Sequence, residues 1–343
     1  MNSKHQTHSK KEYLLVLLFF LVLHSCTRNE PLIARGLTMG TVWMVNIQDP
    51  VVDPSRIKQD IQAELDRIDE LMSNWKEESD VCRFNRLDPE TALVISKDTA
   101  RVITSAQHIY KLTHKRFDPT LSPLIDLWGF ATKERGTFPK PDEIQQALQK
   151  VGFEGIALDG RIIRKTAPER SLNLSAIAKG YAVDCVYDLL ISRGYQRVLV
   201  EVGGEVRASQ HKEENTAWRI GVESPLYGET IEREIIAVVG LSDQALATSG
   251  DYRNFFEYQG RNYSHIINPT TGYPVASPIA SASVVASSCM QADALATAFM
   301  ILSPQESIAI CNANPDWHCL IVERESGVRH YSDGMKELLE HEN

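Results

Sequence analysis

The sequence of 343 residues predicts an α+β fold, because its predicted helices cluster early in the chain and its predicted strands cluster late. Apolar residues recur at helical spacing up to about residue 191, and the alternation typical of strands begins at residue 197. This order argues against a doubly wound parallel sheet. No GxGxxG motif occurs, and no GxxxxGK followed by Ser or Thr, so a bound nucleotide would have to be held by other means.

The first half of the chain is predicted to contain one strand and four helices. The expected elements are a strand over Thr41–Ile47, a helix that begins at Asp53-Pro54-Ser55, and helices over Thr99–Leu112, Pro141–Lys150 and Ser175–Ile191. Residues 73–90 are expected to be irregular, and Phe117–Trp128 is expected to be a loop rich in Pro and apolar residues.

The second half is predicted to be dominated by strands. They are expected over Arg197–Val202, Trp218–Glu223, Glu234–Leu241, Tyr252–Tyr258, Tyr263–Ile267, Ser281–Ser287 and Trp317–Glu323. Gln259-Gly260 predicts a tight hairpin turn. Two further helices are expected over Met290–Leu302 and Pro304–Cys311.

The N-terminus has the features of an exported lipoprotein. Three lysines precede Leu14–Leu23, an apolar run of 10 residues, whereas a permanent membrane span needs about 20. The segment Leu23-His24-Ser25-Cys26 looks like a lipobox. We therefore expect a lipoprotein signal peptide over residues 1–25, a lipidated tether over 26–34 and one domain over 35–343. The mature protein would be membrane-anchored and face the periplasm or the cell exterior. Cleavage that leaves Cys26 unmodified is the alternative.

Charge and cysteine content exclude two classes of function. The formal net charge is −9, and it becomes −11 without residues 1–25, which carry three Lys and one Glu, so a nucleic-acid partner is not expected. The five cysteines after Cys26 contain no CxxC pair, which argues against a zinc site. Cys311 and Cys319 could pair in an oxidising compartment, or could serve as small apolar residues beside a buried strand.

The segment 292–298 carries the strongest local signal for a ligand. Asp293 and Thr297 are four residues apart and would share one face of a helix among alanines. A carboxylate and a hydroxyl on a face without bulk suit a hard cation with a diphosphate beside it. Ser287 or Ser288 could cap that helix. A helix without any ligand would also satisfy this pattern.

A second signal is the segment 173–181, which predicts a loop that leads into a helix. Small residues and a helix N-terminus favour a phosphate, and Lys179 adds positive charge. His265 on a strand could be a general base or a structural histidine. Trp75 in a polar segment could stack on a flat ring or lie at the edge of the core. Gly203-Gly204 predicts a close backbone approach or a bulge.

In sequence order, these segments resemble the ApbE-type flavin transferases, also called FAD:protein FMN transferases or thiamine-biosynthesis lipoproteins. The resemblance covers most of the chain after the tether. It rests on Met39-Gly40-Thr41, Met72–Asn85, Phe117–Phe130, Ser175–Asp184, Gly203-Gly204-Glu205, Ala247–Phe256, Ser264–Pro274 and Ala292–Thr297.

The resemblance implies an α+β, T-fold-like architecture with an antiparallel sheet, packed helices and FAD in a cleft. It also implies a reaction in which FAD is the substrate, Mg²⁺ is the cofactor, AMP is released and FMN becomes joined to a threonine of a target protein. The target would be a subunit of a membrane redox complex.

By position, the resemblance implies that Asp293, Thr297 and the carbonyl group of Ala176 hold Mg²⁺ and that His265 is the base. The residues that it implies for FAD contact are Met39, Trp75, Arg116, Phe117, Asp118, Asn173, Lys179 and Ile267. Asn173 and Asn268 depart from the family, which often has Asp at both positions. The alternatives are a flavin-binding lipoprotein and a pyrophosphatase that hydrolyses FAD to FMN and AMP.

Overall fold

An eight-stranded antiparallel sheet organises the computed structural model, which describes residues 31–340 apart from 90, 131–137, 168, 214–215, 226–233, 251–254, 259–260 and 276–277. Its strand order is β1-β2-β6-β7-β10-β13-β14-β15. The strands are β1 (Leu32–Thr38), β2 (Thr41–Ile47), β6 (Val198–Val202), β7 (Glu205–Ala208), β10 (Gln244–Gly250), β13 (Ile279–Ala286), β14 (His318–Glu323) and β15 (Arg329–Tyr331). The predicted α+β class with an antiparallel sheet and packed helices is confirmed.

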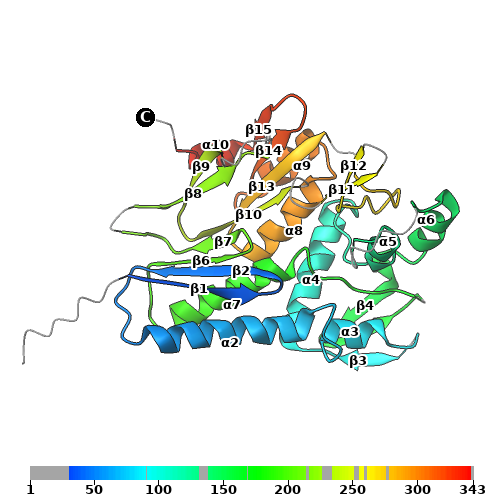
Figure 1. Ribbon diagram of the computed structural model, residues 1–343, viewed down its shortest axis with the longest axis horizontal. Helices are drawn as coiled ribbons and strands as arrows, with labels where there is room; N and C mark the ends of the chain where they lie inside the picture. The colour runs from blue at the N-terminus through cyan, green and yellow to red at the C-terminus, as the bar shows by residue number, and fades with distance from the viewer. Residues whose placement is uncertain are drawn as a thin grey trace, which may run out of the picture.

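Helices cover one face of this sheet and a hairpin covers the other (Figure 1). Successive strand residues point to opposite faces, so Val200 joins the core formed with the helices, whereas Leu199 joins the core under the hairpin. The helices on the first face are α2 (Pro54–Met72), α4 (Lys97–Leu112), α7 (Ala178–Ser192) and α8 (Cys289–Phe299). The second face carries β8 (Trp218–Glu223), β9 (Ile235–Leu241) and α10 (Asp333–Leu338).

Smaller elements complete the fold beside the helical face. They are a three-stranded sheet of β3 (Ala92–Val94), β5 (Ile162–Lys165) and β4 (Ile156–Asp159), a hairpin of β11 (Phe255–Tyr258) and β12 (Arg261–Ser264), the helices α3 (Asp80–Asn85), α5 (Ser122–Leu127), α6 (Pro141–Leu148) and α9 (Pro304–Asn312), and a 3₁₀ turn over Phe153–Gly155.

Helices α7 and α8 cap each other. Asp184 of α7 accepts hydrogen bonds from the backbone N–H groups of Cys289 and Met290, both at 3.0 Å, at the start of α8. Asp293 of α8 accepts a hydrogen bond from the backbone N–H of Gly180, at 3.0 Å, in the first turn of α7. A carboxylate at each helix N-terminus satisfies unpaired N–H groups and complements the helix dipole. The two helices are therefore antiparallel and fixed in register.

A glycine lets the two helices approach this closely. A Cβ atom on Gly180 would lie 2.4 Å from the carbonyl oxygen of Cys289 and 2.9 Å from Cβ of Asp293. The first of these contacts is with backbone, so a side chain at this position would force the helices apart. Ser288 is the N-cap residue of α8, as one of the two expected serines, but its hydroxyl donates to Asp184 at 2.7 Å and makes no capping bond of its own.

Two tight turns are built from residues with positive φ. Met39 and Gly40 join β1 to β2 with φ values of 47° and 73°, and Gly203 and Gly204 join β6 to β7 with values of 65° and 103°. Positive φ at both central positions is the signature of the type I′ turn, whose twist matches that of the paired strands. The close approach predicted for Gly203-Gly204 is therefore a hairpin turn.

The predicted elements Thr41–Ile47, Trp218–Glu223 and the helix after Asp53 are confirmed, and the other helices and strands agree within a few residues. Two predictions are wrong: Phe117–Trp128 contains α5, and residues 73–90 contain α3. The helix predicted over Ser175–Ile191 begins at Ala178, and β1 begins at Leu32, inside the expected tether. Strands β1, β3, β4, β5, β7, β10 and β15 were not predicted. The sequence of β10, QALATSG, lacks bulky β-branched residues, and pairing with β7 and β13 makes it a strand.

Several predictions lie outside the described residues, namely the signal peptide over 1–25, Cys26 with the first part of the tether, and the hairpin turn Gln259-Gly260. Cys311 and Cys319 are buried free thiols, as expected for small apolar core residues. Of the helices that the structure describes, none combines the length and the apolar character that crossing a bilayer requires.

We expect Asp184→Ala to destabilise the fold by about 2–4 kcal/mol, because it removes the cap of α8 and leaves Arg207 without its partner at 2.8 Å. Thermal and urea unfolding measure this loss. The control is Asp188→Ala on the same helix, whose side chain is 59% exposed and lies 3.5 Å from Arg207. Equal stability of the two variants would contradict the role assigned to the cap.

Candidate functional site

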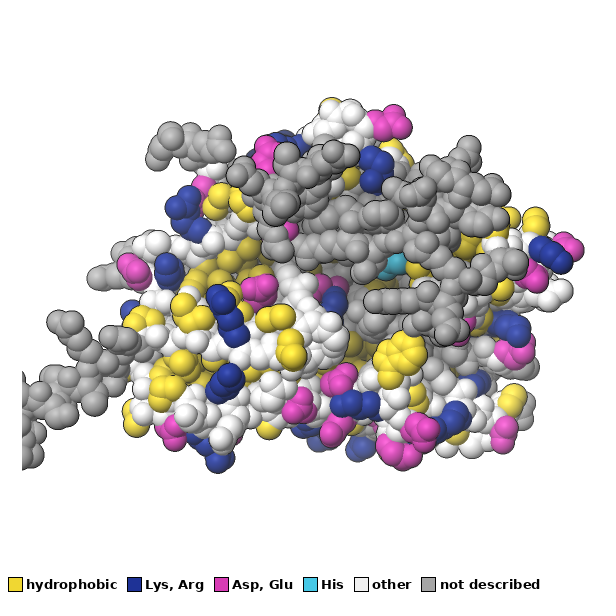
Figure 2. Space-filling view, in the orientation of Figure 1, with side chains coloured by type: hydrophobic (Ala, Val, Ile, Leu, Met, Phe, Trp, Pro, Cys, Tyr) yellow, Lys and Arg dark blue, Asp and Glu magenta, His cyan; other side chains and the backbone are white. Residues whose placement is uncertain are grey.

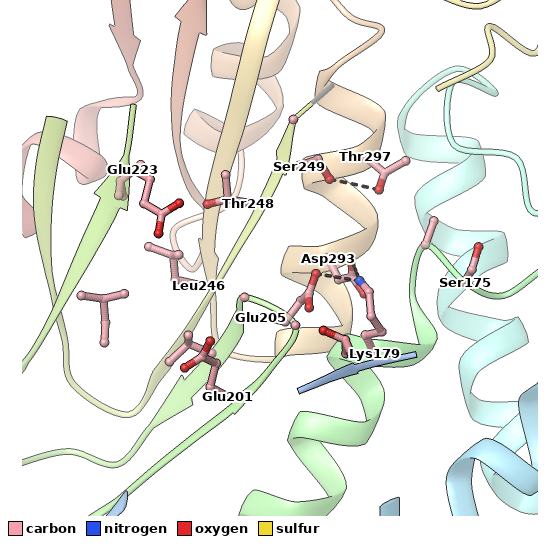
Figure 3. A pocket seen from close by; sticks show the side chains of 18 of the residues that line it. Ser175, Lys179, Glu201, Glu205, Glu223, Leu246, Thr248, Ser249, Asp293 and Thr297 are labelled. Carbon is pink, nitrogen blue, oxygen red and sulfur yellow. Dashed lines mark hydrogen bonds and ion pairs between the residues drawn. The ribbon is translucent and has the colours of Figure 1, made fainter. Parts of the chain in front are cut away.

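A cavity of about 1050 Å³ opens where α7, α8 and the ends of several strands meet. Its lining on the helical side includes Ala176, Lys179, Asp293 and Thr297, together with Glu205 from the start of β7. Figure 3 shows the Lys179, Glu205 and Asp293 side chains gathered in one corner of the cavity. The reciprocal capping of α7 and α8 places these charged groups together.

Lys179 lies between two buried carboxylates. Its Nζ donates to Oε1 of Glu205 at 2.7 Å and lies 3.8 Å from Oδ1 of Asp293. Glu205 and Asp293 are only 5% and 3% exposed. Two carboxyl groups thus face one ammonium group, and when both are ionised they leave a local excess of negative charge that a divalent cation would neutralise.

This arrangement shifts two pKa values. Burial alone would lower the pKa of Lys179, but the charges of Asp293 and Glu205 outweigh burial and raise it, so the lysine is charged at neutral pH. Burial raises the pKa of Glu205 to about 7, against the opposing effect of Lys179. The second oxygen of Glu205, Oε2, is buried without a hydrogen-bond partner. The corner is therefore polar, and not all of its hydrogen-bonding groups have a partner within the chain.

Asp293 and Thr297 offer oxygen ligands on one face of α8. The hydroxyl of Thr297 lies 3.3 Å from that of Ser249 on β10, and Ala176 lines the cavity directly before α7. Mg²⁺ is commonly held by one or two carboxylates together with substrate phosphates and water. Among the described residues no group of three or more His, Cys, Asp or Glu side chains is arranged to hold a metal. One carboxylate and one hydroxyl group beside an open cavity are the kind of donors that a cation shared with a phosphorylated ligand would use.

Asn173 shapes the segment that leads into α7. Its Oδ1 accepts hydrogen bonds from Nδ2 of Asn74 and from the backbone N–H of Ser175, both at 3.0 Å. Both bonds need only an acceptor, so asparagine meets this structural demand as well as aspartate would. The departure from the family at this position leaves the local geometry intact.

Asp118 is a buried carboxylate in the lining of the cavity, next to Pro119, whose carbonyl accepts the N–H of Asn173 at 2.7 Å. It is 8% exposed, and its Oδ1 accepts hydrogen bonds from the backbone N–H and the hydroxyl of Thr120. Burial raises its pKa to about 6, although the bonds from Thr120 act in the other direction. A carboxyl group that titrates near neutral pH thus lines the cavity.

His265 and Ile267 enter the cavity from a turn that is anchored on both sides. Asn268 accepts the N–H of Thr270 on its side chain at 2.9 Å and the N–H of Gly272 on its carbonyl at 2.8 Å. Nε1 of Trp128 donates to the carbonyl of Gly272 at 2.8 Å. The backbone N–H of Asn268 donates to the carbonyl of Tyr273 at 2.9 Å, and the bond at its side chain needs only an acceptor, which either Asn or Asp provides.

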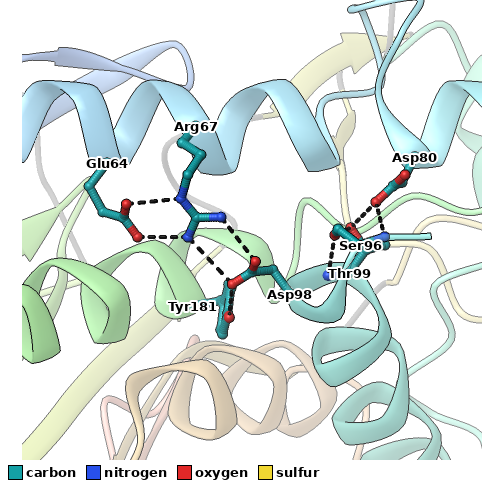
Figure 4. Close-up of polar contacts among 7 residues, drawn as sticks. All are labelled: Glu64, Arg67, Asp80, Ser96, Asp98, Thr99 and Tyr181. Carbon is teal, nitrogen blue, oxygen red and sulfur yellow. Dashed lines mark hydrogen bonds and ion pairs between the residues drawn. The ribbon is translucent and has the colours of Figure 1, made fainter. Parts of the chain in front are cut away.

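A polar network fixes the first turn of α7 against α2 and α4 (Figure 4). Arg67 of α2 donates to Glu64 and to Asp98 of α4, both at 2.9 Å. The hydroxyl of Tyr181 donates to the same Asp98 at 2.5 Å. Since Tyr181 is two residues after Lys179, this network helps to hold the lysine at the cavity.

The cavity brings together ten of the twelve predicted site residues. They are Arg116, Phe117, Asp118, Asn173, Ala176, Lys179, His265, Ile267, Asp293 and Thr297. Met39 and Trp75 are not among the lining residues. Met39 forms the turn before Thr41, which does line the cavity, and Trp75 is 73% exposed.

Sequence reasoning missed two side chains of this site, and it misjudged the start of α7. Glu205 pairs with Lys179 and Ser249 faces Thr297, but neither was singled out. The Gly-Gly pair before Glu205 was the available signal. The helix N-terminus in the segment 173–181 was expected to favour a phosphate, but the backbone N–H of Gly180 in its first turn is already bound by Asp293. Positive charge for a phosphate therefore comes from Lys179 rather than from that amide.

Comparison with known proteins gives a consistent result. A sequence profile described as the ApbE family matches residues 39–321. The chain is 35% identical over 326 residues to a FAD:protein FMN transferase of Vibrio cholerae serotype O1, which covers 94% of this chain and 97% of the relative. It is 32% identical over 286 residues to a FAD:protein FMN transferase of Escherichia coli K12, covering 81% and 80%.

Solved structures agree with these relatives. The flavin transferase ApbE from Vibrio cholerae superposes with a TM-score of 0.82 at 32% identity, covering 90% of this chain and 99% of that one. The apo form of the flavinyl transferase ApbE from Pseudomonas stutzeri gives a TM-score of 0.80 at 31% identity, covering 91% and 98%.

We expect the stability of the protein to carry a pH dependence from Asp118. Its folded-state pKa of about 6 lies above the ordinary value of 3.8, so the folded state holds this proton more tightly than the unfolded state does. The contribution of Asp118 to the free energy of unfolding is fully present below pH 3.8. It is lost as the pH rises through 6, by about 3 kcal/mol in total.

Urea unfolding at several pH values between 4 and 7.5 measures this dependence. The free energy of unfolding of Asp118→Asn should increase relative to that of the wild type as the pH rises. That of Asp142→Asn, at an exposed position of α6, should change with pH in the same way as that of the wild type. A constant difference between Asp118→Asn and the wild type would contradict the assignment.

Proposed function

The chain belongs to the ApbE family, and from that premise we propose that it is a flavin transferase, which moves the FMN half of FAD onto a threonine hydroxyl of a target protein and releases AMP. The observation that carries this proposal is the joint presence of Asp293, Thr297 and Lys179 with His265 in one cavity. Names of relatives at up to 35% identity support the transfer of flavin from FAD to a protein.

We further propose Mg²⁺ as the cofactor. Asp293, Thr297 and the carbonyl group of Ala176 would hold the ion, whose chemistry is to neutralise charge on the diphosphate oxygens and polarise the phosphorus under attack. The buried carboxylate, the nearby hydroxyl groups and the excess negative charge of the corner fit such an ion.

The chain's own residues perform the remaining steps. Lys179 binds the diphosphate as a fixed positive charge. His265 takes the proton of the threonine hydroxyl, which is a weak nucleophile without a base. The hydroxyl oxygen bonds to the phosphorus on the flavin side, and the bond from that phosphorus to the bridging oxygen breaks. AMP leaves with the bridging oxygen and the electron pair.

We also propose where the protein acts and which protein accepts the flavin. The lipobox supports a membrane-anchored lipoprotein that faces the periplasm or the cell exterior. An exported transferase at the membrane suits an acceptor that is a threonine-bearing subunit of a membrane redox complex.

Co-expression with such a subunit from the same genome tests the function. We expect flavin fluorescence on the acceptor band in a denaturing gel, and AMP in equal amount in the purified reaction. Replacing the acceptor threonine by alanine should abolish the fluorescent band. AMP release without a labelled acceptor would instead favour the FAD pyrophosphatase, and flavin binding without AMP would favour the flavin-binding lipoprotein.

We expect Asp293→Asn to reduce transfer at least about 100-fold, because it removes the one charged ligand of the proposed ion. The amide oxygen can still accept the Gly180 N–H, so the cap of α7 is kept and the fold should remain. Steady-state transfer rates over a titration of MgCl₂ measure the loss. Wild-type rates at low Mg²⁺ would count heavily against this site.

For His265→Ala we expect kcat to fall about 100-fold while the Kd for FAD changes less than about threefold, since a base acts on the acceptor hydroxyl and not on bound FAD. Flavin fluorescence titration gives Kd, and acceptor labelling gives kcat. Equal losses in both quantities would make His265 a binding residue.

A further inference from the structure

The hairpin of β1 and β2 at the edge of the large sheet has one buried face and one largely exposed face. Ala34, Trp43 and Val45 lie on the buried face, in the core shared with the helices. The other side chains of the two strands point the opposite way, because successive strand residues alternate. We call this second face the outer hairpin face. Its residues are paired across the two strands as Ile33 with Asn46, Arg35 with Met44, and Leu37 with Val42.

The outer hairpin face is apolar with one cation. Ile33, Leu37 and Val42 are 57%, 74% and 53% exposed, although each is a large hydrophobic residue. Arg35 lies between Ile33 and Leu37 on β1, and its Nη2 is 3.7 Å from the sulfur of Met44. Figure 2 shows hydrophobic side chains gathered over β1 and β2. Exposed apolar side chains that adjoin one another in this way mark a contact surface.

The sequence places the proposed lipid close to this face. Cys26 is six residues before Leu32, where β1 begins. A chain of six residues spans about 20 Å at full extension. The start of β1, and with it Ile33, can therefore lie no further than about 20 Å from a lipid on Cys26.

We propose that the outer hairpin face rests on the bilayer that holds the lipid anchor. Its apolar side chains would lie at the level of the phospholipid headgroups, and Arg35 would contact their phosphate groups. This inference rests on the proposed function, of which the membrane anchor is a part. An anchored protein stays at a high effective concentration beside the membrane, so a few apolar side chains suffice to fix its orientation.

The charge of the outer hairpin face fits a lipid surface. Without residues 1–25 the formal net charge of the chain is −11, which an anionic membrane would repel. None of the six residues of this face is Asp or Glu, and its one charged side chain is cationic. A carboxylate appears only in the next strand of the sheet, where Glu201 of β6 is the partner of Met44 and lines the cavity. The hairpin is thus a part of the surface that can approach phospholipid without repulsion.

The outer hairpin face is continuous with the cavity. Val42, Met44 and Asn46 belong to both, since they also line the cavity. Contact of the hairpin with the bilayer would therefore place this side of the cavity beside the membrane. The inference narrows the acceptor to a threonine in a segment that lies close to the membrane surface.

A tryptophan reporter tests the contact. The full-length lipidated protein carries Leu37→Trp, and the matched control carries Val94→Trp, at an apolar position of β3 that is 58% exposed. Both are reconstituted in vesicles of phosphatidylethanolamine and phosphatidylglycerol with brominated acyl chains, since bromine quenches tryptophan only at close contact. We expect the loss of emission to be at least about three times larger for Leu37→Trp than for Val94→Trp. Adding Arg35→Glu to Leu37→Trp should reduce that loss by at least about half.

The outcomes separate this inference from the proposed function. Flotation with the vesicles tests the anchor, and transfer of flavin to the acceptor subunit in the same preparation tests the transferase. Protein that does not float would remove the anchor and, with it, the contact of the hairpin. Equal quenching of the two reporters in protein that floats, with melting temperatures like that of the wild type, would overturn the inference alone.

Other occupants of the outer hairpin face give different signals. A blue shift of the Leu37→Trp emission that depends on the density of protein in the vesicles, without quenching by bromine, would assign the face to a second copy of the chain. A blue shift that appears only when the acceptor subunit is added would assign it to the acceptor. Either result would overturn the contact with lipid.

Discussion

The site depends on the mutual capping of α7 and α8, in which a carboxylate of each helix binds the N-terminal N–H groups of the other. Asp184 caps α8 and Asp293 caps α7, so neither helix N-terminus is satisfied without the other helix. Gly180 is the position at which the two backbones come closest, and any side chain there would collide with the carbonyl of Cys289. Because the register is fixed in this way, Lys179 and Asp293 meet in the same corner of the cavity. A shift of the helices by one turn, about 5 Å, would separate them.

The cap also orients the proposed metal ligand before any substrate arrives. Oδ2 of Asp293 is held by the Gly180 N–H, and Oδ1 lies toward Lys179 at 3.8 Å. A carboxylate with one oxygen already bound to a backbone N–H loses little conformational freedom when its other oxygen binds an ion. Lys179 is shared between Asp293 and Glu205. A diphosphate that draws this lysine away would leave the two carboxylates facing each other, so the chemistry of the corner favours arrival of a cation together with the diphosphate.

The sequence predicts what is local and misses what depends on pairing between distant segments. Asp293 and Thr297 were found because a spacing of four residues places them on one helical face. Asp184 and Glu205 were not assigned roles, since their partners Cys289 and Lys179 lie 105 and 26 residues away and no periodicity links them. Strand β10 was missed for a related reason: its small side chains carry no strand signal of their own, and its neighbours β7 and β13 decide its conformation. For Trp75 the polar segment allowed either stacking on a flat ring or a place at the edge of the core, and the structure leaves its side chain exposed.

Strand β10 connects the two halves of the cavity through the alternation of its side chains. Thr248 lines the cavity on the side of β8, whereas its neighbour Ser249 faces Thr297 on the helical side. One continuous cavity thus reaches both faces of the large sheet, and its charged corner of Lys179, Glu205 and Asp293 lies on the side of α7 and α8. Because β10 carries Thr248 on one face and Ser249 on the other, a change in the position of this strand would alter both sides of the cavity together.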